Sequence, residues 1–261
     1  MKTKYNSSGN FITTTQYNQK PDRKKRRTSR KFFVIILLVI AIVLASFFSP
    51  IFNISDIKVA GTERISAEDI IVASGIEKGM NIFQGDLTKA KRSISQMPYV
   101  DSIKISRVLP NKIKINIEER KPVGYIPFMG SYIFIDGKGN VLEVVSQLEN
   151  NSLPVIMGLK FSQFKLGEKI KVDEENKLQI VVSCVQEIIS NKLLDKVVRI
   201  DVHDINSIRL NIENRVDVNV GDEFGLRYKM NFLNAILTQI EPKKRGFIDL
   251  NVDKPIFSAE E

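Results

Sequence analysis

The longest apolar run in the chain covers residues 32–48, which carry no charge and consist almost entirely of Phe, Val, Ile and Leu. Continued to Ser49, a helix over this run is about 27 Å long, close to the ~30 Å hydrocarbon core of a bilayer. Pro50 lacks an amide hydrogen and is expected to end the helix. The pattern predicts a single N-terminal transmembrane helix within residues 32–52. A signal peptide cleaved after 43–45 is the alternative, although the 31 residues before the apolar run are long for a signal.

Residues 53–121 carry short apolar patterns in the order strand, helix, helix, strand, strand. Ser66 and Asp86 are the expected N-caps of the two helices, and Gly75 suits the left-handed residue that ends the first. The last two strands alternate with period two on both sides of a turn at 109–112, which indicates a hairpin with one face on a core. Two helices over one face of a small sheet predict an α+β domain of about 70 residues.

Residues 122–254 are richer in strand patterns. Two helices, expected over 174–191 and 224–240, each carry a wide apolar stripe. The fold class is therefore α+β: a small βααββ domain at 53–121, then a larger mixed sheet with flanking helices at 122–254. Residues 255–261 remain as a short C-terminal tail. The strands expected in the larger domain are 132–135, 141–142, 197–202, 208–212, 216–220 and 246–252.

Charge is distributed unevenly along the chain. Residues 1–31 hold ten Lys or Arg and one acid, whereas the rest of the chain holds 29 bases and 29 acids. Because positively charged flanks stay in the cytoplasm, residues 1–31 are expected inside the cell and residues 53–261 outside it. The polar, basic tail at 1–31 is expected to be disordered. The balanced charge of the remainder argues against a nucleic-acid-binding face.

Few side chains are candidates for catalysis. His203 is the only histidine and Cys184 the only cysteine, so the chain can form neither a His-based metal cluster nor an internal disulfide. His203 is expected on a surface strand or turn, where Asp201 could share its side, and Cys184 is expected to be a buried or half-buried, inert thiol. The loop at 136–140 has one carboxylate, too few for calcium, and is expected to be a hairpin turn. The sequence predicts no catalytic residue, no metal site and no cofactor.

Several short motifs follow the expected membrane helix in a fixed order. They are Ile54 to Gly61, Gly75-Ile76, Gly79 to Phe83, Met97 to Val100, Arg107 to Pro110, Ile117 to Val123, Phe134-Ile135-Asp136 with Gly139, Leu153-Pro154 with Gly158, and Ile248 to Leu250. In this order they resemble the FtsQ family of bacterial cell-division proteins, called DivIB in Gram-positive bacteria. Residues 53–121 resemble the POTRA domain of that family, and residues 122–254 resemble its β-domain.

The resemblance implies a non-enzymatic, membrane-anchored scaffold of the divisome, concentrated at the division septum. It implies two small bitopic partners, FtsB (or DivIC) and FtsL, bound on the extracytoplasmic side. Through them the family influences the septal peptidoglycan synthase. The family uses the last strand of its β-domain to contact FtsB, and the matching stretch here is Phe247 to Lys254.

A strand near a chain end often lies at the edge of a sheet, where a partner strand can pair with its free backbone groups. On that hypothesis Phe247, Asp249, Asn251 and Asp253 face the partner, while Ile248, Leu250 and Val252 face the core. The alternative is an internal strand. The basic cluster at 243–245 is either solvated surface or a contact for an acidic partner. The candidate partner-binding residues are Phe247, Asp249, Asn251, Val252, Asp253 and Lys254.

Two other classes of function compete with a scaffold. POTRA-like modules also occur in protein-transport components, but those chains usually carry several such modules or a barrel with repeated amphipathic strands. An anchored cell-wall enzyme would need paired carboxylates, a Cys/His pair or a zinc set in a cleft, and the lone His203 and lone Cys184 make most of these arrangements impossible.

Overall fold

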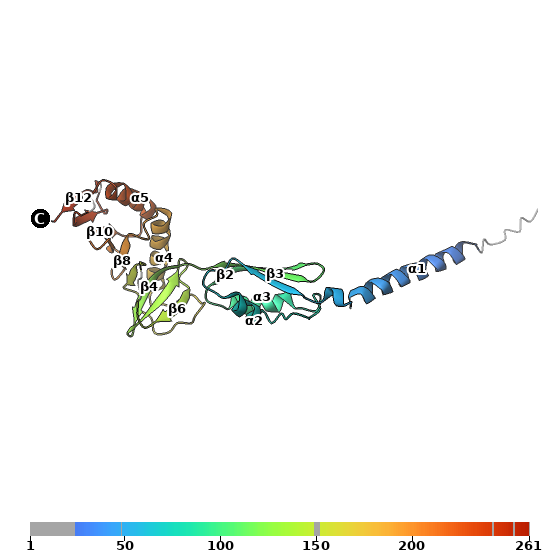
Figure 1. The fold of residues 1–261 in the computed structure, drawn as a ribbon. Helices are drawn as coiled ribbons and strands as arrows, with labels where there is room; N and C mark the ends of the chain where they lie inside the picture. Colours follow the sequence, from blue (N-terminus) through green and yellow to red (C-terminus); the bar gives the residue numbers. More distant parts are fainter. Residues whose placement is uncertain (1–23, 48, 149–151, 242, 253, 261) are drawn as a thin grey trace, which may run out of the picture. The chain divides into compact units, whose positions relative to one another are not determined.

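The computed structural model describes residues 24–47, 49–148, 152–241, 243–252 and 254–260. The chain forms two compact units, Met1–Phe52 and Asn53–Glu261, and its helices and some of its strands are labelled in Figure 1.

The first unit contains helix α1 (Lys24–Phe47) and a short 3-10 helix (Pro50–Phe52). The helix therefore begins inside the basic tail, and the expectation of disorder was wrong for residues 24–31. Lys and Arg are good helix formers, so they extend a helix that the apolar run nucleates. Residues 1–23 of the expected tail lie outside the described residues. Over the part of the chain that the structure describes, no helix reaches the length and apolarity needed to cross a membrane.

The second unit begins with what we call the small module: β1 (Asp56–Ala60), α2 (Ala67–Ser74), α3 (Leu87–Ser95), β2 (Val100–Val108) and β3 (Lys112–Glu119). Its three strands lie in the order β1-β3-β2. Strand β1 is parallel to β3, and β3 is antiparallel to β2. Helices α2 and α3 cover one face of this sheet (Figure 1). The βααββ order and the hairpin are confirmed.

Local signals in the small module act as the sequence predicts. The Ser66 hydroxyl accepts the backbone N–H of Asp69 at 3.0 Å, and Asp86 accepts the N–H groups of Thr88 and Lys89. Gly75 ends α2 in the left-handed conformation, with φ of 64°. Ile113, Ile115 and Ile117 are buried beneath the helices and alternate with polar residues on the open face.

The rest of the second unit is the large module, built on a mixed nine-stranded sheet in the order β12-β11-β10-β9-β8-β7-β4-β5-β6. Helix α4 (Glu175–Ser190) connects the parallel strands β7 and β8, and helix α5 (Leu226–Leu237) connects the parallel strands β10 and β11. The strands are β4 (Pro122–Phe128), β5 (Ser131–Asp136), β6 (Val141–Val145), β7 (Val155–Met157), β8 (Val197–Asp201), β9 (Ile208–Ile212), β10 (Val216–Gly221), β11 (Gly246–Asp249) and β12 (Phe257–Ala259).

One hydrophobic core joins the two long helices to the sheet. Leu178, Val181 and Val185 of α4 and Met230 and Leu233 of α5 are all buried against strand residues. The predicted mixed sheet with flanking helices is confirmed.

Three strands of the large module were not expected from the sequence. Prolines at 122 and 127 obscure the pattern of β4. Strands β7 and β12 have three residues each, which is too short for a period to be visible. The segment expected as a C-terminal tail therefore contributes a strand, β12.

Candidate functional site

The C-terminal edge of the large sheet differs from the expectation. Strand β11 pairs in parallel with β10 on one side and antiparallel with β12 on the other. The prediction that Gly246 to Val252 forms the edge strand was therefore wrong, and β12 is the edge strand. The physical reason is that the chain turns after β11 and lays Phe257–Ala259 along the backbone groups that β11 would otherwise expose.

The candidate partner-binding residues lie at and just beyond the end of β11. Ile248 and Leu250 are buried as expected, whereas Phe247 is 45% exposed. The expectation that Val252 faces the core was wrong, because its side chain is 49% exposed. Asn251 and Lys254 are exposed and Asp249 is half-buried. Asp253 lies outside the described residues.

Strand β11 ends at Asp249, and the alternation of buried and exposed side chains fails at Val252, because the Asp249 carboxylate redirects the backbone. The Asp249 side chain accepts the N–H of Asn251 at 2.9 Å and the side-chain amide of Asn219 at 3.1 Å. The Asn251 amide is therefore bonded within the turn and is not a free edge group. This explains why residues 251–252 leave the strand.

The free backbone groups belong to β12. The N–H of Glu260 donates to the carbonyl oxygen of Arg245 at 3.0 Å. Alternation along an antiparallel ladder then directs the backbone groups of Ser258 toward β11 and those of Phe257 and Ala259 away from it. The edge presents two residues whose N–H and C=O groups can pair with another strand.

A groove of about 530 Å³ lies between α5 and the segment that carries β12; its wall is mainly apolar, with Gln239, Glu241 and Lys244 as its polar residues. Ile256, in its wall, is 70% exposed. Other apolar residues of the wall are Phe232, Ala235, Ile236, Ile240, Pro255, Phe257 and Ala259. Sequence reasoning missed this wall, although the adjacent apolar pair Ile256-Phe257 in an otherwise polar tail was the available signal.

The outer surface of β8–β10 is polar and largely neutralises its own charge. Arg199 pairs with Asp217 at 3.5 Å, and the Asn211 side-chain amide donates to the same carboxylate oxygen of Asp217 at 2.9 Å. Phe247 lines one side of a shallow depression of about 460 Å³ on this surface. The candidate Phe247 therefore borders a polar, charge-balanced surface.

His203 follows β8 on the surface, as predicted. Its Nδ1 lies 2.7 Å from the Asp201 carboxylate, and its backbone N–H also donates to that carboxylate. Burial acts to raise the pKa of Asp201, but these two hydrogen bonds and the neighbouring charges of His203 and Arg199 lower it overall. The pair is a local turn contact.

Cys184 is fully buried on α4, as predicted. Burial, and secondarily the charge of Glu187, raises the pKa of its thiol to about 12. A thiol that stays protonated at neutral pH is a poor nucleophile.

The loop at 136–140 forms the expected hairpin turn between β5 and β6. The Asp136 carboxylate accepts the N–H groups of Lys138 and Asn140 and the Asn140 side-chain amide. These bonds stabilise the turn from inside. In the described ranges, no three His, Cys, Asp or Glu side chains gather closely enough to hold a metal ion.

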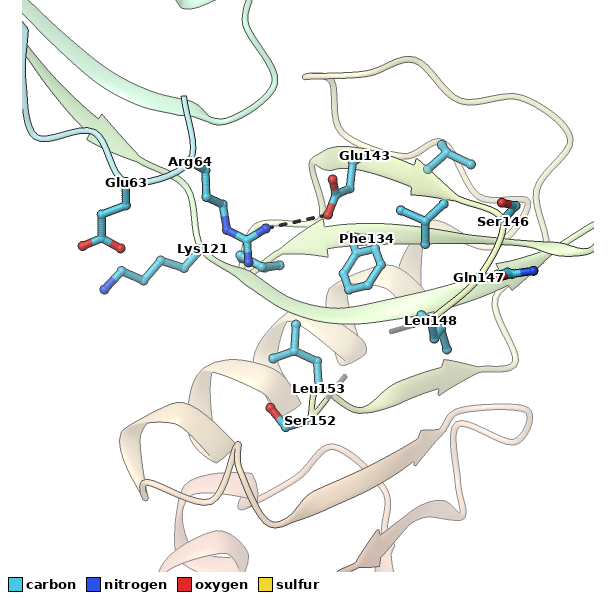
Figure 2. A pocket seen from close by; sticks show the side chains of 13 residues that line it. Glu63, Arg64, Lys121, Phe134, Glu143, Ser146, Gln147, Leu148, Ser152 and Leu153 are labelled. Carbon is cyan, nitrogen blue, oxygen red and sulfur yellow. Dashed lines mark ion pairs between the residues drawn. The ribbon is translucent and has the colours of Figure 1, made fainter. Parts of the chain in front are cut away.

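Figure 2 shows a larger pocket, of about 960 Å³, between the small module and β6. Arg64 reaches from the small module to Glu143 of β6 at 3.8 Å (Figure 2) and lies 5.4 Å over the ring of Tyr99. Burial, followed by the hydrogen bond and charge of Glu143, raises the pKa of Tyr99. Arg64 and Glu143 pair with each other across this pocket, which is the arrangement of a structural contact between the modules.

Arg120 makes a second contact between the modules. Its guanidinium donates to the carbonyl oxygens of Pro98 at 3.1 Å and Gly167 at 3.0 Å. Its Nε lies 3.6 Å from the Asp136 carboxylate and 3.9 Å from that of Asp101. Arg120 thereby connects the small sheet, the turn of β5–β6 and the loop at Gly167.

Comparison with known proteins gives consistent matches. Residues 52–120 match the family described as POTRA domain, FtsQ-type. The chain is 31% identical over 214 residues to the cell division protein DivIB of Clostridium acetobutylicum, covering 81% of this chain and 85% of the relative. It is 29% identical over 215 residues to DivIB of Clostridium botulinum, covering 81% of this chain and 83% of the relative. It is also 29% identical over 147 residues to the cell division protein FtsQ of Corynebacterium glutamicum, covering 50% of this chain and 66% of the relative.

Proposed function

Because the chain belongs to the DivIB/FtsQ family of cell-division proteins, we propose that it is a non-enzymatic scaffold of the division machinery, anchored in the cell membrane by one helix. The proposed partners are small anchored division proteins of the FtsB/DivIC and FtsL types, bound outside the cytoplasm. Through them the chain would support septum formation and septal peptidoglycan synthesis. This assignment of partners and location follows the family resemblance of the sequence.

The proposed anchor is the apolar run within residues 32–52, with its N-terminus in the cytoplasm. The large apolar side chains from Phe32 to Leu44 on α1 are between 41% and 67% exposed. A helix with apolar side chains exposed all round is favoured in lipid. The ten basic residues before the run support the proposed orientation.

The proposed domains correspond to the two sheets. Residues 1–31 are the cytoplasmic tail, 53–121 the POTRA domain and 122–254 the β-domain. We assign residues 255–261, the expected tail, to the partner-binding edge because β12 lies within them.

One observation supports the partner site most directly: β12 is an edge strand beside an apolar groove. A partner strand can pair with the outward groups of Phe257 and Ala259, and its apolar side chains can enter the groove. Phe247, Asp249, Asn251, Val252 and Lys254 remain proposed contacts beside this edge. Asp253 stays a prediction from the sequence alone.

Ala259→Pro tests this site, because proline removes an outward amide hydrogen without removing a bond to β11. The assay is co-purification of the full chain from detergent extracts with co-expressed DivIC-type and FtsL-type proteins. We expect capture to fall about tenfold or more, consistent with loss of a backbone bond and its neighbours.

Ala259→Ser is the matched control, because it keeps the amide and should capture the partner normally. Continued protection of Cys184 from thiol reagents reports that the large module stays folded. Normal capture by a folded Ala259→Pro chain would refute pairing at this edge.

A further inference from the structure

The chain enters the second unit through residues 53–55, whose backbone is hydrogen-bonded to two loops. The N–H of Ile54 donates to the carbonyl oxygen of Met80 at 2.8 Å, and the carbonyl oxygen of Ile54 accepts the N–H of Gly79 at 2.8 Å. The N–H of Ser55 donates to the carbonyl oxygen of Asn111 at 2.9 Å. We call the loops at 77–80 and 108–112 the base loops. They are held directly beside the first residues after Phe52.

The base loops expose apolar side chains together. Leu109 is 60% exposed, Val108 45% and Met80 38%. Arg107 fixes the end of β2, because its guanidinium donates to the carbonyl oxygens of Ile82 at 2.7 Å and Gly85 at 2.8 Å. The apolar side chains are therefore presented by a braced hairpin end and not by a freely moving loop.

Lysines surround this end of the module on the open face of the small sheet. Lys58 on β1 lies directly opposite Lys114 on β3, and Lys112 lies two residue pairs closer to the hairpin turn, opposite Asp56. All three are exposed. Within the described ranges none of them forms an ion pair. Like charges placed opposite each other in a sheet are destabilising, so the Lys58–Lys114 pair favours an anionic ligand, whereas the charge of Lys112 is partly offset by Asp56 opposite it.

We propose that the base loops rest on the membrane surface, with Met80, Val108 and Leu109 among the lipid headgroups and Lys58, Lys112 and Lys114 against anionic headgroup phosphates. The proposal rests on the proposed membrane anchor. Three peptide units separate Phe52 from Ser55, so chain length alone keeps Ser55 within about 11 Å of the end of that anchor. Exposed apolar groups flanked by lysines are the composition that binds the headgroup region of an anionic bilayer.

The test uses the full chain in nanodiscs of phosphatidylcholine with or without phosphatidylglycerol. A single environment-sensitive fluorophore is attached at Leu109→Cys, which is selective because Cys184 is fully buried. Met129→Cys is the matched control, since Met129 is an apolar residue, 91% exposed, in the turn between β4 and β5. We expect blue-shifted emission at position 109, quenched by lipids that carry a quencher near the headgroup, and water-like emission at position 129.

The lysine contribution is tested by the triple variant Lys58→Gln, Lys112→Gln and Lys114→Gln in the Leu109→Cys background. Each lysine should change the equilibrium between bound and unbound loops about fivefold, and only in discs that contain phosphatidylglycerol. Added salt should weaken the bound state.

The outcomes separate this proposal from the one on which it rests. A chain that fails to enter nanodiscs contradicts the anchor. An inserted chain whose label at position 109 behaves like the label at 129 overturns the lipid contact. A shift at 109 that requires an added protein partner, and not anionic lipid, also overturns it.

Discussion

Strand β12 can lie close against β11 because Gly246 has no side chain. It pairs with Ala259 across β11 and β12. A Cβ atom at this position would overlap the backbone carbonyl oxygen of Ser258 and approach the ring of Phe257 to 2.6 Å. Because a backbone atom is involved, Gly246→Ala can be accommodated only if β12 moves.

The net free energy that docks β12 on β11 is close to zero. Ordering three residues costs about 3–6 kcal/mol of backbone entropy. About three backbone hydrogen bonds return roughly 1.5–4.5 kcal/mol, and partial burial of the Phe257 ring adds about 1–2 kcal/mol. An overpacked methyl group costs about 1–3 kcal/mol. Gly246→Ala should therefore shift β12 from mainly docked to mainly undocked while the rest of the sheet persists.

Hydrogen exchange measures this shift directly. The amides of Ser258 and Glu260 face β11, so their exchange should accelerate to the rate of an unprotected amide, because undocking removes the small protection that docking gives. Partner capture should fall with it. Gly137→Ala is the matched control, since the nearest atom to a Cβ at that position is Val123 Cγ1 at 3.9 Å. Unchanged exchange at Ser258 and Glu260 in Gly246→Ala would refute the steric argument.

Three further predictions concern the stability of the second unit. Cys184 should react with a thiol reagent only as urea unfolds the large module, because its thiol is buried and its pKa is raised to about 12; fast reaction in native buffer would contradict this. Arg120→Lys should lower the free energy of unfolding by about 2 kcal/mol, measured by urea titration, because a single ammonium nitrogen cannot both bond the carbonyl oxygens of Pro98 and Gly167 and replace Nε beside the Asp136 carboxylate; equal stability would show that the contact is dispensable. Glu119→Gln should lower the free energy of unfolding, because the Glu119 carboxylate accepts the N–H groups of Glu63, Arg64 and Ile65. The loss should be only about 1 kcal/mol, because this carboxylate is partly solvated. Burial acts to raise the pKa of Glu119, but these bonds and the Arg64 charge lower it overall, so the difference should be full above the ordinary pKa of 4.5 and vanish as pH falls through the folded-state pKa; a difference independent of pH would refute it.

Features that depend on neighbours in sequence were predictable. Ser66 and Asp69 form their capping contact within one helical turn, and the strands around 109–112 are close enough in sequence for their alternation to reveal a hairpin. Such signals need no knowledge of distant segments, which is why the small module could be predicted almost completely.

The candidate site could be predicted only in part, because its geometry depends on pairing between distant segments. Alternation along 246–252 gave the correct side for Phe247, Ile248 and Leu250. It failed at Val252, because the backbone N–H of Asn251 donates to the Asp249 carboxylate and the chain leaves the strand there. Strand β12 takes the edge position by pairing with β11, and a segment of three residues is too short for its sequence pattern to predict that pairing. The partner role of these residues stays a prediction.

The parallel pairing of β1 and β3 has a mechanical consequence. The chain enters β1 at Asp56, beside Lys112, and leaves β3 at Glu119, beyond the opposite end of the shared register. Tension applied along the chain between Asn53 and Pro122 therefore pulls the two strands lengthwise past each other. All five register pairs between β1 and β3 are then loaded at the same time, in shear, and the strands cannot separate one pair after another.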